Sequence, residues 1–457
     1  MCLQKYKKIG RVQKERGKKF RPPYPIPGDG KGCASFLDFY RRKQVLSFVD
    51  SHKSCIFAEK NEMSMETKRT AVVGGGAAGF FLAINLKERC PQMQVDILES
   101  SSRVLRKVEV SGGGRCNLTN TFAHINDLRE VYPRGHRVMG RLLKHFGHQN
   151  TWQWFEQRGV ALTAQADGCV FPRSQDSHTI IQLFLDESAR RGINIKTGCR
   201  ITSLDALADY DYVCIATGGQ PKQAGLQWLE HEVEPPVPSL FTLGIADEAL
   251  QRLTGLVVQD VQALIPGTKL RAQGALLITH WGLSGPCILR LSSYAARHLA
   301  EANYHSPLML NWTGTDEATT LQAIVAAEKQ HARRNVTHQP PLPMLPQRLW
   351  SYLATKALGQ RAEQPWGGMN AKEMRRLTNV LVSDEYTISG RAPHRDEFVT
   401  CGGIALKAVN PNTLESPTRP GLFFAGEVLD IDGITGGFNL QAAWTTAHTV
   451  ARAISEK

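Results

Sequence analysis

The sequence predicts an α/β protein with a doubly wound, Rossmann-like sheet that is interrupted by an insertion. An apolar strand candidate, residues 70–73, leads into the glycine-rich turn 74–79, and a helix candidate, 80–89, follows directly. A second strand candidate, 94–99, completes a strand–turn–helix–strand order within about 30 residues, which is the parallel unit of a doubly wound sheet. The same α/β pattern returns near residue 402.

Hydrophobic spacing predicts the other elements of this α/β unit. Residues 138–158 carry apolar side chains at helical intervals, and a helix is expected from a cap at 176 or 177 through 191. Residues 212–219 predict a buried strand that ends in a pair of glycines. Near the C-terminus, a strand is expected within 420–426 and a final helix over 440–454.

The composition changes between the two α/β stretches. From about residue 239 to 271 the sequence predicts short strands broken by glycine and proline, and residues 315–378 are more helical. We therefore expect a basic N-terminal extension, the first part of a nucleotide-binding domain, an inserted domain on the substrate side, and the last part of the nucleotide-binding domain. The predicted limits of these four regions are 1–66, 67–238, 239–378 and 379–457.

The positive charge of the chain is concentrated in the N-terminal extension. The 457 residues have a net charge of +13, and residues 1–66 supply 15 basic and 7 acidic side chains, which leaves +5 for the rest. A nucleic-acid partner would therefore depend mainly on the extension, and we do not expect one. We interpret the extension as a disordered tail, or as residues upstream of a natural start near Met63 or Met65, in preference to a nucleic-acid or membrane-surface arm.

The ten cysteines are scattered, without a CxxC pair or the spacing of a metal site, and we expect reduced thiols and no metal. The most apolar run, residues 70–86, has 17 residues and four glycines, whereas a membrane span needs about 20 apolar residues. No apolar segment of a signal peptide follows the basic start. These observations predict a cytoplasmic protein without a membrane partner.

The first motif that indicates chemistry is the turn Gly74-Gly75-Gly76-Ala77-Ala78-Gly79. Gly74 permits the tight turn, Gly76 lets the backbone approach a pyrophosphate at the start of the helix, and Gly79 allows the helix to pack closely on the strand. Glu99 ends the next strand 20 residues after Gly79, where a carboxylate can accept hydrogen bonds from an adenosine ribose. An acidic residue here favours an unphosphorylated ribose, and thus FAD or NAD over NADP.

The second motif extends from Lys107 to Asn120. A strand-like piece leads into Gly112–Gly114, where the backbone can pass close to a flat ring or a phosphate. Arg115, Asn117 and Asn120 follow as donors. A mobile glycine hinge is the structural alternative. Cys116 has no neighbouring cysteine, so we expect a buried and inert thiol.

The third motif lies at 421–441, where a strand, an acidic turn and a Gly-Gly step precede a helix. The N-terminus of that helix would stabilise negative charge on a reduced isoalloxazine ring. Glu427 and Asp430 are expected to bond ribityl hydroxyls. The alternative is a simple loop before a helix.

Four segments together resemble the BaiN/YhiN-like flavoproteins, over roughly residues 68–457. These segments are 74–79 with Glu99, Ser111–Asn120, Thr279–Pro286 and Gly426–Asn439. The resemblance implies non-covalent FAD in a glutathione-reductase-like domain, with an inserted β-barrel-like and helical part that covers the flavin. It also implies flavin redox chemistry, described both as reduction of a conjugated steroid-type enone and as amine oxidation.

The sequence therefore predicts an FAD-dependent oxidoreductase. The residues predicted to bind the cofactor are Gly74, Gly76, Ala77, Ala78, Gly79, Glu99, Lys107, Ser111, Gly112, Gly113, Gly114, Arg115, Cys116, Asn117, Thr217, Gly218, Gly219, Gly426, Glu427, Asp430, Gly436, Gly437, Asn439, Leu440 and Gln441. No catalytic residue is assigned; His280 lies in the insertion, but a lone histidine is more often structural.

The expected reaction is NAD(P)H-linked reduction of a small, hydrophobic, conjugated substrate by hydride transfer from the flavin. Outside the extension there is no second GxGxxG after a strand, so NAD(P)H would bind without such a fold, or the substrate would reduce the flavin directly and oxygen would reoxidise it. The alternatives are an oxygen-using amine oxidase and a flavin-containing protein that binds or modifies RNA. The sequence predicts no oligomeric state.

Overall fold

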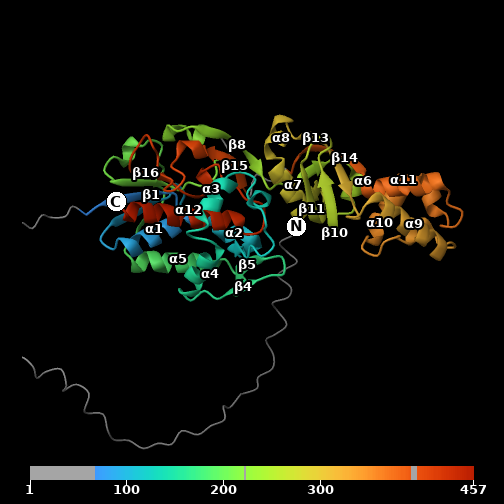
Figure 1. The fold of residues 1–457 in the computed structure, drawn as a ribbon, viewed down its shortest axis with the longest axis horizontal. Helices are drawn as coiled ribbons and strands as arrows, with labels where there is room; N and C mark the ends of the chain where they lie inside the picture. The colour runs from blue at the N-terminus through green and yellow to red at the C-terminus, as the bar shows by residue number, and fades with distance from the viewer. Residues whose placement is uncertain (1–66, 221–222, 393–398) are drawn as a thin grey trace, which may run out of the picture. The chain divides into compact units, whose positions relative to one another are not determined.

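The computed structural model describes residues 67–220, 223–392 and 399–457 (Figure 1). The predicted N-terminal extension, residues 1–66, lies outside the described residues. Within the described ranges, every helix is too short or too polar to pass through a lipid bilayer.

The centre of the α/β unit is a five-stranded sheet in the order β16-β7-β1-β2-β6. Every neighbouring pair of these strands is parallel, which confirms the doubly wound α/β class. The strands are β1 Arg69–Val73, β2 Gln94–Leu98, β6 Asn194–Lys196, β7 Tyr212–Ile215 and β16 Leu422–Phe424. The strands predicted at 70–73, at 94–99 and within 420–426 are thus confirmed, and the strand predicted over 212–219 is confirmed for residues 212–215. A small antiparallel sheet, β3-β5-β4, consists of Thr119–Asn120, Cys169–Pro172 and Leu162–Ala164.

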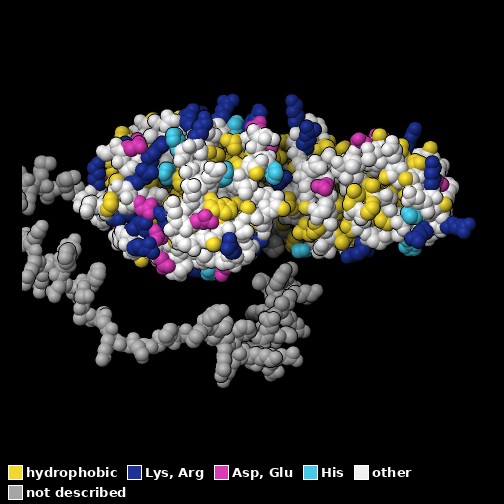
Figure 2. All heavy atoms as spheres, turned by 60° about the horizontal axis from the view of Figure 1, so that its bottom comes forward, with side chains coloured by type: hydrophobic (Ala, Val, Ile, Leu, Met, Phe, Trp, Pro, Cys, Tyr) yellow, Lys and Arg dark blue, Asp and Glu magenta, His cyan; other side chains and the backbone are white. Residues whose placement is uncertain are grey.

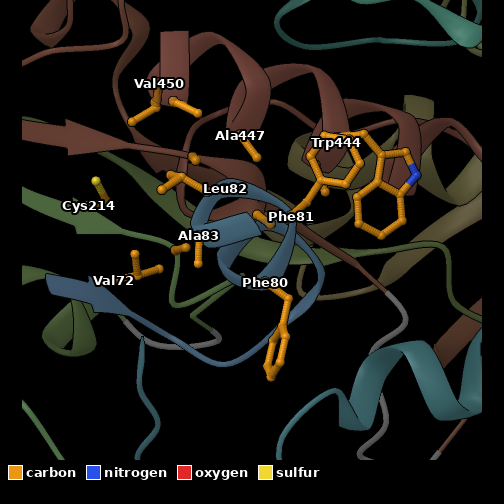
Figure 3. Packing of buried hydrophobic residues seen from close by; sticks show 14 of the residues in the cluster. Val72, Phe80, Phe81, Leu82, Ala83, Cys214, Trp444, Ala447 and Val450 are labelled. Atoms are coloured by element: carbon orange, nitrogen blue, oxygen red, sulfur yellow. The ribbon is translucent and has the colours of Figure 1, made fainter. Parts of the chain in front are cut away.

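Helices α1 and α12 pack against each other beside this sheet and form much of its core. The ring of Phe81 in α1 lies 5.2 Å from that of Trp444 in α12, and both residues are fully buried (Figure 3). Because these helices come from opposite ends of the described chain, their packing brings the first and third motifs together. The helices of the α/β unit are α1 Ala77–Arg89, α2 Arg106–Gly114, α3 His136–Leu142, α4 His148–Glu156, α5 His178–Arg190 and α12 Phe438–Ser455.

Two local expectations were wrong. The strand-like piece at 107–110 is part of helix α2; its alternating valines resemble a strand, yet only Val108 is buried, whereas Val110 is 64% exposed. The helical spacing over 138–158 belongs to two helices, α3 and α4, because the chain between them leaves the helical path before Gly147, the N-cap of α4.

The insertion contains a closed barrel in the order β10-β11-β12-β9-β14-β13, and it has a second hydrophobic core that includes Trp312 and Trp350. Its strands are β9 Leu243–Ile245, β10 Val257–Leu264, β11 Arg271–Thr279, β12 Gly282–Ser284, β13 His305–Asn311 and β14 Asp384–Arg391. Its helices are α6 Glu248–Gln251, α7 Pro286–Tyr294, α8 Ala296–Glu301, α9 Glu317–Gln330, α10 Gln347–Leu358 and α11 Ala371–Val382. On either side of the barrel in the chain, β8 Val233–Ser239 and β15 Val399–Ile404 pair with each other. Strand β14 thus follows residue 378, the predicted end of the insertion.

A buried carboxylate on β2 connects this strand to β6 and to the turn before β7. Asp96 is fully buried and accepts hydrogen bonds from Asn194 Nδ2 at 2.9 Å, Lys196 Nζ at 2.8 Å and Tyr210 Oη at 2.7 Å. Burial alone would raise the pKa of Asp96, but the hydrogen bonds from Lys196, Tyr210 and Asn194 outweigh it and lower the pKa to about 2.

We expect Asp96→Asn to destabilise the protein at neutral pH by about 2 kcal/mol. Because the folded-state pKa is lowered, this contribution is present above the unfolded-state pKa, near 4, and is lost as the pH falls towards 2. Thermal unfolding of both proteins across this range measures the effect, with the exposed Asp186→Asn as control. An equal difference in Tm at pH 7 and at pH 2.5 would contradict the assignment.

Candidate cofactor-binding site

In the loop between β1 and α1, one glycine has free space at the position of a side chain, and a glycine before it and a glycine after it are packed against backbone atoms. A Cβ on Gly74 would lie 2.3 Å from the carbonyl oxygen of Ala216, and a Cβ on Gly79 would lie 2.0 Å from the carbonyl oxygen of Gly74. A Cβ on Gly76, in contrast, would meet no described atom within 4 Å. Gly76 is the N-cap of α1, and no side chain in the described ranges caps this helix. The loop therefore leaves space and free N–H groups where a pyrophosphate would bind.

Glu99 stands at the end of β2, directly beside this loop. Its Oε2 accepts a hydrogen bond from the Gly75 N–H at 2.8 Å, and its Oε1 accepts one from the Ser101 N–H at 2.8 Å. Partial burial acts to raise the pKa of Glu99, but the hydrogen bonds from Ser101 and Gly75 outweigh it, and the net pKa is lowered. The carboxylate is therefore ionised at neutral pH and available as an acceptor.

The second motif begins in α2 and leaves the helical path at Ser111, so Gly112–Gly114 have non-helical backbone although they lie within the bounds of α2. Gly113 and Gly114 have φ angles of +70° and +85°, and a Cβ on either would meet no described atom within 4 Å. Gly112 is closely packed, because a Cβ on it would lie 2.7 Å from the backbone nitrogen of Asn117. The backbone of Gly113–Gly114 is thus accessible to a ligand without interference from side chains. Positive φ also explains why glycines stand here.

Glu427 joins the third motif to the second one and to the end of β7. Its Oε2 accepts a hydrogen bond from Lys107 Nζ at 2.8 Å, and its Oε1 accepts one from the Thr400 N–H at 2.9 Å. A Cβ on Gly219 would lie 2.6 Å from Glu427 Oε1. The third motif also reaches the first one, since a Cβ on Gly426 would lie 2.8 Å from the Cβ of Ala78.

The N-terminus of α12 lies against the segment that follows the second motif. A Cβ on its N-cap, Gly437, would lie 2.2 Å from the carbonyl oxygen of Thr119. With its amide oriented to satisfy both neighbours, Asn117 accepts from the Gly437 N–H and donates to the Thr119 carbonyl oxygen, each at 3.2 Å. The neighbouring Gly436 carbonyl oxygen accepts from Asn120 Nδ2 at 3.0 Å. No described side chain caps α12, and its first turn has no acidic residue, so its N–H groups and its dipole favour a negative ligand.

Several side chains of the predicted set are engaged within the protein instead. Gln441 is fully buried, accepts from Thr119 Oγ1 at 2.5 Å and Thr151 Oγ1 at 2.9 Å, and donates to a third threonine, Thr445. Asn439 bonds the N–H and the carbonyl oxygen of Gly433, both at 2.8 Å. These two side chains shape the loop before α12 and the base of the helix.

Four more members of the predicted set have protein partners or are buried. Arg115 Nε donates to the Gly112 carbonyl oxygen at 3.1 Å, and its guanidinium lies 4.2 Å from the centre of the Phe171 ring. Asp430 Oδ1 lies 3.3 Å from Arg297 Nη2. Ser111 Oγ donates to the Val108 carbonyl oxygen at 2.8 Å. Cys116 is fully buried, and burial raises the pKa of its thiol to about 12, so the thiol stays protonated.

The contacts bring the glycine loop, Glu99, Gly112–Gly114, the end of β7 and the third motif into one neighbourhood. Thr217 belongs to it, since its Cα lies 2.9 Å from a Cβ built on Gly74. Sequence reasoning missed Thr400, whose N–H holds Glu427 at 2.9 Å, and nothing in the local sequence marks it. It also missed Val104, whose Cγ1 would lie 2.8 Å from a Cβ on Gly75. The open loop at the N-terminus of α1 and the N-terminus of α12, which no described side chain caps, suit the pyrophosphate and the flavin ring of an FAD molecule.

Known proteins match this chain along most of its length. Residues 68–453 match the model of the HI0933-like protein Rossmann domain. The chain is 27% identical over 419 residues to the 3-dehydro-bile acid delta(4,6)-reductase of Clostridium scindens, covering 85% of this chain and 99% of that protein. It is 25% identical over 416 residues to the ribosomal RNA dihydrouridine synthase of Haemophilus influenzae, covering 84% and 98%. The Escherichia coli protein of that name is 27% identical over 415 residues, covering 85% and 98%.

Solved structures that match this chain are less similar to it in sequence. The 3-ketosteroid delta1-dehydrogenase of Sterolibacterium denitrificans has a TM-score of 0.42 and 11% identity, covering 85% of this chain and 100% of that one. A flavocytochrome c3 fumarate reductase has a TM-score of 0.39 and 14% identity, covering 86% and 78%. Because the family model spans residues 68–453, the chain belongs to the HI0933-like family, the BaiN/YhiN group that its motifs resemble, and is an FAD-dependent oxidoreductase.

Proposed function

We propose that this oxidoreductase uses NAD(P)H to reduce a carbon–carbon double bond conjugated to a carbonyl group in a small, hydrophobic molecule. The observation that carries the proposal is the match with the bile acid reductase, which covers 99% of that protein and not only its nucleotide-binding part. The insertion is therefore shared, and the insertion is where we expect the substrate to bind.

Different residues of the site would bind different parts of FAD. The N-terminus of α1 at Gly76 would receive the pyrophosphate, Glu99 the adenosine ribose, and Glu427 with Lys107 the ribityl chain. The flavin supplies hydride transfer between a nicotinamide donor and a substrate carbon. The N-terminus of α12, which no described side chain caps, would stabilise negative charge that develops on the reduced ring.

A second candidate substrate is a uracil base in ribosomal RNA. The names of two relatives, the ribosomal RNA dihydrouridine synthases, favour it. Addition of hydrogen to the 5,6 double bond of uracil is also reduction of a double bond conjugated to a carbonyl, so the same flavin chemistry would serve. The two candidates differ in the size and charge of the molecule that the insertion must admit.

Anaerobic stopped-flow spectroscopy tests the proposal in two steps. NADPH or NADH should bleach the visible absorbance of the bound flavin, and a panel of amines should not. The reduced enzyme is then mixed with a 3-oxo-4,6-diene bile acid or with unmodified ribosomal RNA. Rapid return of the flavin colour with the bile acid alone supports the small-molecule substrate, and return with RNA alone supports the second candidate. Bleaching by an amine and not by NAD(P)H would overturn the proposal in favour of an oxidase.

A further inference from the structure

The corner between α7 and α8 of the insertion is fastened to the loop 429–434 of the α/β unit. This loop carries Asp430 and Asp432 and leads directly to Gly436–Gly437 at the start of α12. Two arginines make the connection, one from the α/β unit and one from the insertion. From the sequence, Asp430 of this loop is expected to bond the ribityl chain, and the two arginines are not part of that expectation.

Arg134 is the central residue of this connection. Its Nε donates to Asp432 Oδ1 at 2.6 Å, and its Nη2 donates to Asp432 Oδ2. On its other edge, Nη1 donates to the carbonyl oxygen of Ser293, at the end of α7, at 2.7 Å. Ser239 Oγ also donates to Asp432, at 3.2 Å. One planar guanidinium thus bonds the loop and the insertion at the same time.

The pair is nearly removed from water, with side-chain exposures of 14% for Arg134 and 1% for Asp432. Burying two charges has a large desolvation cost, so such a pair is weak evidence for stability. Its forked hydrogen bonds nevertheless restrict the relative position of the segments that they join. A lysine could replace this arginine only in part, because its single ammonium cannot span the carboxylate and the Ser293 carbonyl oxygen with a rigid fork.

Arg297, at the start of α8, adds a weaker connection. Its Nη2 lies 3.3 Å from Asp430 Oδ1, and its Nη1 lies 3.3 Å from Glu234 Oε2 on β8. Its side chain is 38% exposed, so solvent screens these contacts. Tyr294, between the two arginine contacts, donates from its hydroxyl to the Glu130 carbonyl oxygen at 2.7 Å.

The loop has other ties that do not involve the insertion. Asn439 bonds Gly433, and the Ile434 N–H donates to the Val131 carbonyl oxygen at 2.9 Å. The cofactor side of the loop should therefore keep its shape without Arg134. On the other side, α7 follows β12 after Gly285 alone, and β12 pairs with β11, so α7 is linked directly to the hairpin that carries the turn His280–Trp281.

We propose that Arg134 is a positioning residue that holds the α7–α8 corner against loop 429–434 and thereby sets where the barrel presents substrate to the flavin. This inference rests on the proposed function, in which the insertion binds the substrate. In this role Arg134 fixes the distance between the bound substrate and the bound FAD. Loss of Arg134 should therefore weaken productive substrate binding more than it weakens cofactor binding.

The test compares Arg134→Met, Arg134→Lys and the double variant Arg134→Met/Asp432→Asn, which buries no lone charge and guards against misfolding of the single variant. Arg158→Met is the matched control, because Arg158 is also a buried arginine, 13% exposed, but its partners Glu88 and Glu187 lie within the α/β unit. Each holoprotein is assayed with NADPH and a 3-oxo-4,6-diene bile acid. FAD content and amide hydrogen exchange of residues 286–301 are measured in parallel.

We expect the Arg134→Met and double variants to keep one FAD per chain and to show a KM for the bile acid raised about tenfold or more, with faster exchange in 286–301. The KM and the exchange rate of Arg134→Lys should lie between those of these variants and those of the wild type. Arg158→Met should lower Tm with an unchanged KM. An unchanged KM or unchanged exchange in the double variant overturns the inference, as does an equal rise of KM in Arg158→Met. If the wild type does not turn over the bile acid, the proposed function fails, and exchange in 286–301 alone then decides whether Arg134 holds the corner.

Discussion

Gly76→Val is expected to yield a folded protein that has lost its FAD. A Cβ at this position would meet no described atom within 4 Å, and the backbone, with φ −97° and ψ −167°, is one that valine adopts readily. The isopropyl group would occupy the space in which we place the pyrophosphate. We expect the affinity of the apoprotein for FAD to fall by about 100-fold or more, which corresponds to about 3 kcal/mol. Reconstitution followed by quenching of FAD fluorescence measures it.

Gly147→Val is the matched control for this variant. Gly147 is the N-cap of α4 and has nearly the same backbone, with φ −99° and ψ −169°. Its added Cβ would lie 2.9 Å from the Leu143 carbonyl oxygen, so the substitution should disturb the fold more than Gly76→Val does. It should nevertheless retain FAD. A yellow Gly76→Val protein with one FAD per chain would show that the pyrophosphate lies elsewhere.

Glu427→Leu is the second substitution expected to have a large effect. The carboxylate is held between the Lys107 ammonium and the Thr400 N–H, at 2.8 Å and 2.9 Å, beside Gly219. Leucine removes the acceptor that we assign to the ribityl hydroxyls and leaves the Thr400 N–H without its partner. Hydrogen bonds to charged groups contribute about 1.5–3 kcal/mol, so the Kd for FAD should rise about 10-fold to 100-fold.

The chain offers a close control for Glu427→Leu. Glu415 also accepts from a backbone N–H, that of Gly421 at 2.8 Å, and from a lysine, Lys457 at 2.6 Å. Its side chain is 16% exposed, against 19% for Glu427. Glu415→Leu should therefore lower Tm by a similar amount without changing the Kd for FAD, and Glu427→Gln should retain part of the affinity. Equal losses of FAD in both leucine variants would mean that Glu427 acts only through stability.

The parts of this protein that the sequence predicted are those set by local pattern. A strand, three glycines, a helix and a terminal Glu99 follow one another within a short stretch, so their local geometry follows from the chain itself. The same reasoning failed at α2, because alternating valines fit a strand as well as a short helix with one buried face. Which face of such a segment is buried depends on its packing against the rest of the protein, and the local sequence does not contain this information.

Side-chain direction at the end of the chain was not predictable either. Gln441 and Asn439 stand in a glycine-rich motif and resemble cofactor ligands by position. Gln441 instead accepts hydrogen bonds from buried threonines of two other segments, and Asn439 accepts one from the Gly433 N–H. The pair Arg134–Asp432 joins residues 298 positions apart, and only the fold places them together. Polar residues of this kind take their role from tertiary contacts, whereas the glycines take theirs from backbone geometry.

The convergence of three glycine-bearing segments on one FAD molecule is tested most directly by a crystal structure of the protein purified with its cofactor. We expect the pyrophosphate beside Gly76, the adenosine ribose within hydrogen-bond distance of Glu99, and the flavin ring between Gly113–Gly114 and the N-terminus of α12. A flavin bound away from these segments, or a colourless protein that takes up no added FAD, would contradict the assignment of the site.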